Sequence, residues 1–205
     1  MDVGKIAKKL LGPGIFVLAL CTSTGAAIAA PVTGAIFTTN VDGSFVNGNV
    51  YDYPDDVYLD GGPRPNAPCS AAGLPDGDYY FQVTDPSGSE LLSNDDISNR
   101  TVTVASGVIT KYVGTHTTSI GQCGSITVQL YPYNPTLNPG GEYKVWMTPV
   151  GSYTPGAGSY GFIPKYSKTD NFKVLIPCLD GYNYDPETNS CVLVVPPEST
   201  PPPVE

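Results

Sequence analysis

One run of sixteen residues, 73–88, constrains the fold of this chain more than any other stretch. It reads Gly-Leu-Pro-Asp-Gly-Asp-Tyr-Tyr-Phe-Gln-Val-Thr-Asp-Pro-Ser-Gly. Proline presets φ for a tight turn and glycine accepts the positive φ that ends it, so the run begins and ends with a turn sequence. Between the turns the side chains alternate, which directs Tyr79, Phe81 and Val83 to one face of a strand. The side chains directed to the opposite face are Asp78, Tyr80, Gln82 and Thr84.

A second run, residues 137–152, repeats much of this pattern. It reads Leu-Asn-Pro-Gly-Gly-Glu-Tyr-Lys-Val-Trp-Met-Thr-Pro-Val-Gly-Ser, and it aligns with the first run when one residue is treated as an insertion. Tyr79 then corresponds to Tyr143, roughly 64 residues later. Such a spacing is too long for a solenoid repeat and fits two small β domains in tandem.

The run 73–88 resembles the signature strand of the prealbumin-like (transthyretin-like) β-sandwich domains of bacterial surface proteins, which include the collagen-adhesin B-type repeats. In that family a Leu-x-x-Gly-x-Tyr strand leads into a Pro-x-Gly turn. The resemblance covers about sixteen residues of the first copy and is weaker in the second. It implies a β-sandwich fold and a place at a bacterial cell surface, although a fold of this kind supports many functions.

Residues 1–29 have the features of a secretory signal peptide. Three lysines precede an apolar stretch over residues 10–20, and residues 27–29 read Ala-Ile-Ala, a small-x-small cleavage site. The alternatives are less well matched. An uncleaved membrane anchor needs roughly 18 to 20 apolar residues, and a lipoprotein anchored at Cys21 would need a small residue where Leu20 stands. We therefore expect an exported protein, secreted or held at the cell surface.

Charge and composition support an extracellular β protein. The whole chain has 10 basic and 19 acidic residues, and removing the predicted signal takes away three lysines and one aspartate, which leaves a formal charge of −11. A chain this acidic is a poor partner for nucleic acid. With 23 Gly, 21 Pro and 14 Tyr, the composition is typical of secreted all-β modules. No apolar stretch after the signal is long enough to span a membrane.

These observations predict an all-β chain with two tandem sandwiches. We expect the first domain over residues 30–105 and the second over 106–176. A loop bracketed by cysteines follows at 177–194, and a Pro-rich tail at 195–205 is expected to be disordered or to adopt polyproline II. The strands expected besides the two similar runs are 35–39, 45–51, 57–59, 90–92, 101–105, 108–112, 125–131 and 171–176.

Cysteine number points to disulfides. Cys21 is expected to leave with the signal, and the four remaining cysteines form an even set in an exported chain. Cys178 and Cys191 bracket a short loop and are the local pair. Cys69 and Cys123 remain, and a bond between them would tie a loop of the first domain to the start of the second.

Few residues suggest catalysis or metal binding. His116 is the only histidine and lies in a short Thr-rich segment, which we interpret as a linker or an exposed edge. No catalytic motif is present, so no enzyme is expected, with a small hydrolase built on two carboxylates as the least favoured alternative. No cofactor is expected. Asp55, Asp56 and Asp60 lie close in sequence and could supply oxygen ligands to calcium, although solvated acidic turns explain them equally well.

A binding site is indicated by aromatic residues in the second half of the chain. Strand alternation sends Trp146 and Lys144 outward, and Tyr131 outward on a neighbouring run. Exposed aromatic rings on a sheet often hold sugar rings, but these side chains could equally pack against another domain or a loop.

The sequence therefore predicts a secreted, non-enzymatic structural or adhesive module of a bacterial cell surface or extracellular matrix. The alternative is a carbohydrate-binding module that uses Trp146, Tyr131 and Lys144. The expected partner is an extracellular protein or a polysaccharide.

Overall fold

The structure is a computed structural model that describes residues 32–46, 48–185, 187–188 and 190–195. The predicted signal peptide lies outside the described residues. So does the predicted Pro-rich tail, apart from Val195.

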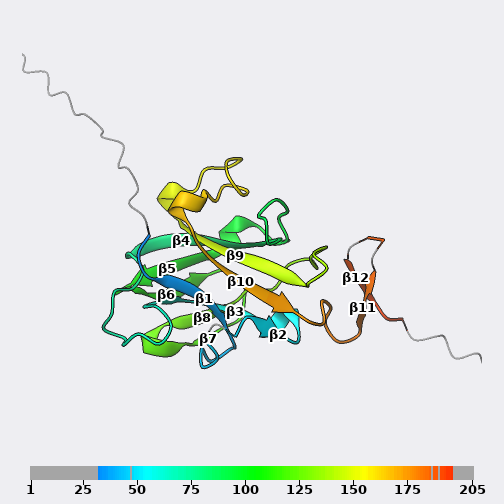
Figure 1. Ribbon diagram of the computed structural model, residues 1–205, viewed down its shortest axis with the longest axis horizontal. Helices are drawn as coiled ribbons and strands as arrows, with labels where there is room; N and C mark the ends of the chain where they lie inside the picture. Colours follow the sequence, from blue (N-terminus) through cyan, green and yellow to red (C-terminus); the bar gives the residue numbers. More distant parts are fainter. Residues whose placement is uncertain (1–31, 47, 186, 189, 196–205) are drawn as a thin grey trace, which may run out of the picture.

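The described chain is mostly β and contains two main sheets and a separate hairpin (Figure 1). The four-stranded sheet has the order β1 (Ala35–Thr39), β3 (Tyr58–Gly62), β8 (Ile126–Gln129) and β7 (Thr118–Ile120). The six-stranded sheet has the order β2 (Val50–Tyr51), β10 (Lys168–Val174), β9 (Glu142–Pro149), β4 (Gly77–Thr84), β5 (Thr101–Ala105) and β6 (Val108–Val113). The hairpin consists of β11 (Tyr182–Asp185) and β12 (Ser190–Leu193). Short 3₁₀ helices are η1 (Pro54–Asp56), η2 (Ile97–Asn99), η3 (Gln122–Gly124), η4 (Val150–Ser152) and η5 (Pro164–Tyr166).

Both sheets combine strands from the two predicted halves. β3 pairs with β8 in one sheet and β4 pairs with β9 in the other. The predicted boundary at 105/106 falls inside the turn of the antiparallel β5–β6 pair. The division into two tandem sandwiches therefore does not describe this arrangement, which is one sandwich. The two similar runs are antiparallel neighbours at the centre of the six-stranded sheet, where Phe81 faces Met147 and Val83 faces Val145.

The core fills the space between the two sheets, and β4 supplies its centre. Tyr79, Phe81 and Val83 are 2 %, 0 % and 0 % exposed, which confirms the face predicted for them. Fully burying a side chain of this size contributes roughly 1.5 to 3 kcal/mol. At one end of the core the rings of Tyr143 and Phe172 stack with their centroids 5.1 Å apart. One continuous set of buried side chains thus joins the two halves of the chain.

The outer face of β4 and β9 is also covered, by the segment 150–167. Gln82 donates to the carbonyl of Ser159 at 2.8 Å, and Thr148 donates to the carbonyl of Tyr166 at 3.2 Å. Phe162 on this segment is fully buried. The two central strands are therefore enclosed on both faces around Gln82, Trp146 and Thr148.

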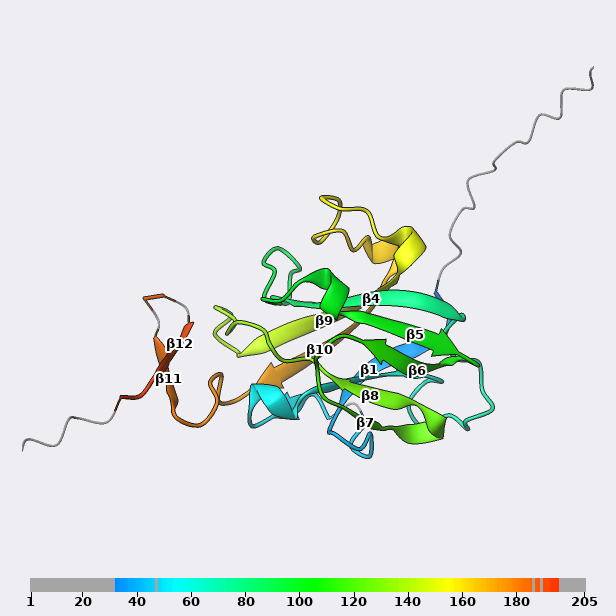
Figure 2. The same cartoon turned by 180° about the vertical axis from the view of Figure 1, so that it is seen from behind.

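The described chain enters and leaves the sandwich at opposite ends. β1 begins near one end, and β10 runs toward the other end, where the β11–β12 hairpin projects (Figures 1 and 2). The two strands belong to different sheets but are linked, because the backbone N–H and the hydroxyl of Thr38 both donate to Asp170 Oδ2, at 2.8 and 3.1 Å.

Two disulfides brace the chain. Cys178 bonds to Cys191 at the base of the hairpin, as predicted. Cys69 bonds to Cys123, which ties the loop after β3 to η3. Bonds of this kind form and persist in oxidising compartments, so they fit an extracellular protein.

Candidate functional site

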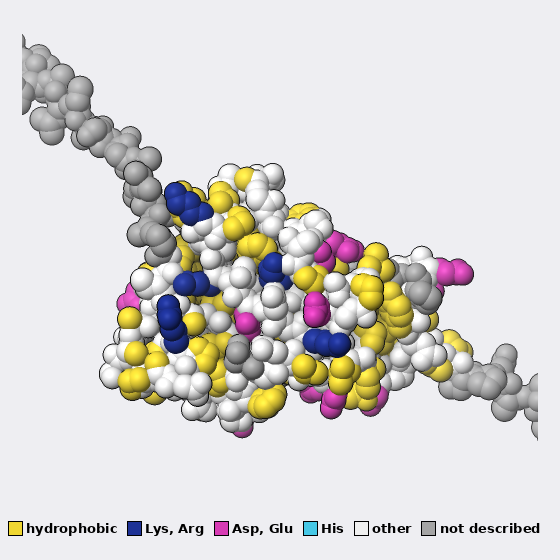
Figure 3. All heavy atoms as spheres, viewed as in Figure 1, with side chains coloured by type: hydrophobic (Ala, Val, Ile, Leu, Met, Phe, Trp, Pro, Cys, Tyr) yellow, Lys and Arg dark blue, Asp and Glu magenta, His cyan; other side chains and the backbone are white. Residues whose placement is uncertain are grey.

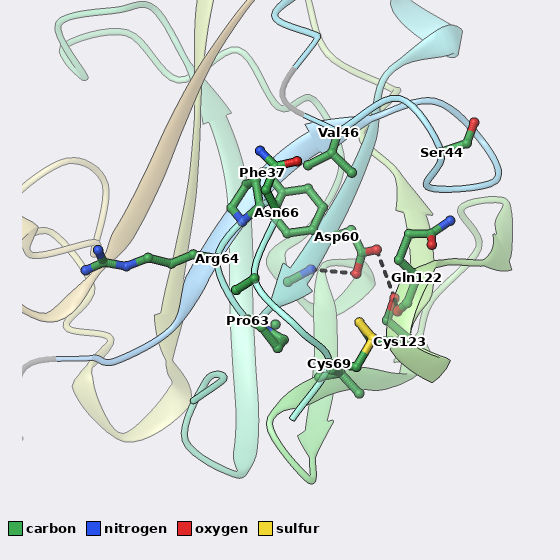
Figure 4. A pocket seen from close by; sticks show the side chains of 16 residues that line it. Phe37, Ser44, Val46, Asp60, Pro63, Arg64, Asn66, Cys69, Gln122 and Cys123 are labelled. Carbon is green, nitrogen blue, oxygen red and sulfur yellow. Dashed lines mark hydrogen bonds between the residues drawn. A yellow bond between two sulfur atoms is a disulfide. The ribbon is translucent and has the colours of Figure 1, made fainter. Parts of the chain in front are cut away.

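A pocket of about 340 Å³ opens on the outer face of the four-stranded sheet (Figure 4). Phe37 on β1 and Asp60 on β3 are cross-strand partners there. Their neighbours Ile36 and Leu59 belong to the core, and successive side chains of a strand point to opposite faces. Phe37 and Asp60 therefore point away from the core and into the pocket. The remaining polar and disulfide residues of its wall include Asn66, Gln122, Ser125, Cys69 and Cys123.

Asp60 is the unusual residue of this pocket, because its carboxyl group is buried. It is 1 % exposed, Oδ1 accepts the Gly61 N–H at 2.7 Å, and Oδ2 accepts the Ser125 hydroxyl at 2.8 Å. Burial raises the pKa of Asp60 to about 6, and the hydrogen bonds from Ser125 and from the Gly61 and Gln122 backbone partly oppose that rise. Neither of the two ion pairs among the described residues involves this carboxyl group.

The turn that carries η3 is built around Asp60. Ser125 Oγ also lies 2.7 Å from the Gln122 carbonyl oxygen, and because a serine hydroxyl carries one proton, it donates to the turn or to the carboxyl group at any one moment. Gly121 allows this approach, because a Cβ there would lie 2.6 Å from Asp60 Oδ2 and would also contact the Ser125 hydroxyl. The Cys69–Cys123 bond then fixes the turn against the loop over the pocket.

The wall of the pocket carries one carboxyl group and two side-chain amides. The exposed side-chain amides of Asn66 and Gln122 can hydrogen-bond a small hydroxylated ligand, whereas Phe37 and Asp60 are themselves buried. Asp60 is the only carboxylate among the described residues that line it, whereas a two-carboxylate hydrolase needs a second one several ångströms away. Arg64 lies at the rim, and its side chain points away from the pocket (Figure 4).

The predicted calcium ligands are not brought together. Asp55 and Asp56 belong to η1, whereas Asp60 lies inside β3 and faces the pocket. No group of three or more His, Cys, Asp or Glu side chains suited to a metal ion occurs in the part of the chain that the structure describes. Asp56 instead accepts the Tyr53 N–H at 3.3 Å within its own turn.

Trp146 is on the outer face of the sheet, as the alternation predicted, but it is not exposed. It is 4 % exposed, and its indole Nε1–H donates to the Thr84 hydroxyl at 2.9 Å. The Lys144 ammonium lies 5.5 Å from the ring centroid. The alternative of packing under a loop is therefore the one observed, and the ring offers no open platform for a sugar. Tyr131 lines a different hollow, beside the C-terminal hairpin.

His116 differs from its predicted position at a linker or exposed edge, since it is buried in an ionic network. Its Nε2 lies 2.9 Å from Asp95 Oδ2, and its Nδ1 lies 2.7 Å from the carbonyl of Gln129. Because both partners are acceptors, both bonds form only when both ring nitrogens carry a proton. Arg100, fully buried, contacts the other oxygen of Asp95 at 2.6 Å.

This network joins three separate segments of chain. Arg100 also donates to the carbonyls of Leu130 and Pro132, at 3.2 and 2.6 Å. The loop before β5, the loop before β7 and the end of β8 are thereby held together. Nothing in the spacing of these residues indicated the cluster, and the only available signal was that Arg100 is one of two arginines in the chain.

Comparisons of the chain with protein-family models, with curated proteins and with solved structures found no match. Among the described residues, no helix has the length and apolar character needed to cross a membrane.

Proposed function

We propose that this chain is an exported, non-enzymatic structural or adhesive module of a bacterial cell surface or extracellular matrix, and that it acts in series with neighbouring segments. The resemblance of the run 73–88 to prealbumin-like repeats supports a role of this kind. The two disulfides support an extracellular location, because such bonds persist in oxidising compartments.

The observation that carries this proposal is the placement of the first and last strands of the sandwich. The chain enters at β1 and leaves from β10 at opposite ends, so tension applied through the chain runs along the strands (Figure 1). Tension in that direction loads many inter-strand hydrogen bonds together. Pulling a strand away sideways would break them one at a time.

The disulfide between Cys69 and Cys123 shields part of the fold from such tension. Cys69 and Cys123 are 54 residues apart in sequence, so an intact bond keeps the intervening segment out of the extended chain. That segment includes β4, β5 and β6.

Single-molecule stretching tests the proposal. With attachment points at Val32 and Leu175, we expect a higher unfolding force than with points at Leu137 and Leu175. Leu137 and Leu175 lie at one end of the antiparallel β9 and β10 strands, where Lys173 faces Glu142. Pulling on these two points therefore separates the strands one hydrogen bond at a time. Reduction should lengthen the stretched chain by about 190 Å for the 54-residue segment, at roughly 3.5 Å per residue. Equal forces in the two geometries would contradict a mechanical role.

The pocket beside Asp60 favours a second candidate, the binding of a carbohydrate or another small hydroxylated ligand. Retention of the protein on a panel of insoluble polysaccharides tests it. Binding in the pocket predicts that Asn66→Ala and Gln122→Ala reduce retention, whereas Trp146→Phe does not. Retention that only the Trp146 variant abolishes would contradict binding at this pocket.

A further inference from the structure

A second hollow, of about 240 Å³, lies between the sandwich and the C-terminal hairpin. Aromatic and apolar residues form most of its wall, and two amides stand at its edge. Figure 3 shows hydrophobic side chains gathered at this end of the molecule. We call this hollow the tyrosine groove, and it is lined by Tyr131, Tyr133, Tyr182, Pro135, Pro177, Leu179, Asn94, Asn134 and Cys191.

The tyrosine rings are held in fixed positions by the sandwich. Tyr133 is buried and its hydroxyl donates to the Pro54 carbonyl at 3.1 Å. Its ring packs edge-on against Tyr131, with centroids 6.1 Å apart. Tyr182 approaches from the hairpin and is 44 % exposed. Burial raises the pKa of Tyr131, and the nearby Tyr182 contributes to that rise. Two tyrosines from different elements thus form neighbouring walls.

The groove favours an extended ligand with apolar rings. None of the described residues that line it carries a charge, so it offers no ion-pair partner to a charged group. Rigid aromatic walls pack well against proline rings, and a polyproline II segment leaves its carbonyl groups free to accept hydrogen bonds. The amides of Asn94 and Asn134, which are linked at 3.2 Å, can serve as donors at the edge.

The sequence itself contains a proline-rich segment that directly follows the hairpin. Residues 196–205 read Pro-Pro-Glu-Ser-Thr-Pro-Pro-Pro-Val-Glu and lie outside the described residues. They follow β12, in which Leu193 pairs with Tyr182, and the Val194 N–H donates to the Gly181 carbonyl at 2.8 Å. The last described residues of the chain therefore lie beside the element that carries Tyr182, one wall of the groove.

We propose that the tyrosine groove binds residues 196–205 of the same chain in an extended polyproline conformation. Six steps of about 3.1 Å allow Pro201 to lie up to roughly 19 Å from Val195. The three residues between the proline runs, Glu198 to Thr200, lack the fixed φ of proline and can redirect the chain across Tyr182 toward Tyr131. The hairpin disulfide between Cys178 and Cys191 holds the Tyr182 wall in place for this contact.

The test compares a chain ending at Glu205 with one ending at Val195, and uses a synthetic peptide of residues 196–205 as the probe. We expect the ring resonances of Tyr131 and Tyr182 to differ between the two chains, and the peptide to restore the longer chain's shifts when added to the shorter one. The longer chain should bind the free peptide at least tenfold more weakly, because the tethered segment competes at an effective concentration in the millimolar range.

Matched variants locate the contact. Tyr182→Ala in the shorter chain should abolish peptide binding, whereas Tyr160→Ala, an exposed tyrosine on the segment 150–167, should leave it unchanged. A peptide with Pro201, Pro202 and Pro203 replaced by alanine should not bind.

Three results would overturn the proposal. One is identical tyrosine shifts in the two chains. Another is shifts in the longer chain that depend on protein concentration, which would indicate binding between copies. The third is a groove that responds to a polysaccharide but not to the peptide.

Discussion

Phe37 and Asp60 face each other across the β1–β3 pair, on the side of the sheet turned away from the core. An aromatic ring thus lies beside a buried carboxyl group, and the loop closed by Cys69–Cys123 covers both. The arrangement keeps water from Asp60, and this burial raises the pKa of its carboxyl group to about 6.

Asp60 should make stability depend on pH. Its folded pKa of about 6 lies above the usual 3.8, so the fold favours the protonated acid. The contribution is fully present below pH 3.8 and is lost as pH rises through 6, and by pH 7.5 the loss amounts to about 3 kcal/mol at most. Asp60→Asn removes this dependence and keeps a hydrogen bond, since its amide can donate to Ser125. Urea unfolding should therefore show the variant more stable than wild type at pH 7.5, with the difference shrinking toward pH 4. A variant that is less stable at both pH values would contradict this account.

The two disulfides should differ in their effects. The chain-entropy relation gives about 4 kcal/mol for the bond between Cys69 and Cys123 and roughly 3 kcal/mol for that between Cys178 and Cys191. Replacing the first pair by serine should lower the unfolding midpoint of the whole sandwich. Replacing the second pair should loosen only the hairpin and leave the main transition in place. Amide hydrogen exchange distinguishes these outcomes, and loss of protection in β4 and β9 on removing the hairpin bond would contradict the expectation.

Asp95 should be essential to the buried network. Asp95→Ala leaves Arg100 and His116 without their shared acceptor, and breaking a buried pair in this way costs about 3 to 5 kcal/mol. Asp180→Ala, at an exposed position, should change the free energy of unfolding by less than about 0.5 kcal/mol. Chemical denaturation of the two variants gives the comparison. Similar small losses in both would mean that the network contributes little.

Trp146 should report on the segment 150–167. As the only tryptophan, and with its ring enclosed, it should emit at short wavelength and resist quenching by acrylamide. Ser159→Asp places a charge beside the close packing of Gly88, Ser159 and Trp146, so it should shift the emission to longer wavelength. The matched control is Thr154→Asp, at an exposed position of the same segment, which should leave the spectrum unchanged. A wild-type ring that acrylamide quenches readily would contradict the enclosed position.

Alternation along the chain was enough to assign the buried face of β4, because side-chain direction in a strand is a local property. The partner of a strand is not local. The similarity between residues 73–88 and 137–152 indicated two domains, but two similar strands can equally lie side by side in one sheet, as β4 and β9 do. Two tandem domains and two adjacent strands of one sheet are both compatible with the same sequence, and only the long-range strand pairing distinguishes them.

The missed features have the same physical origin. Trp146 points to the outer face as its position requires, yet whether a loop covers that face depends on the path of residues 150–167. Asp95, Arg100 and His116 meet because three loops converge at one end of the sheets, and their spacing follows neither strand nor helix periodicity. The local pair of cysteines, by contrast, could be assigned because so short a loop leaves its ends close together.

The borders of the two sheets also bear on crowding. Proteins at high density meet one another often. An exposed edge strand has unpaired N–H and C=O groups, through which neighbouring copies can join into fibres. Here β2 has only two residues, β7 has three, and β6 exposes Lys111. On β1, the Asp170 carboxylate already occupies the backbone N–H of Thr38. These features disfavour pairing between copies along the edge strands of the two main sheets.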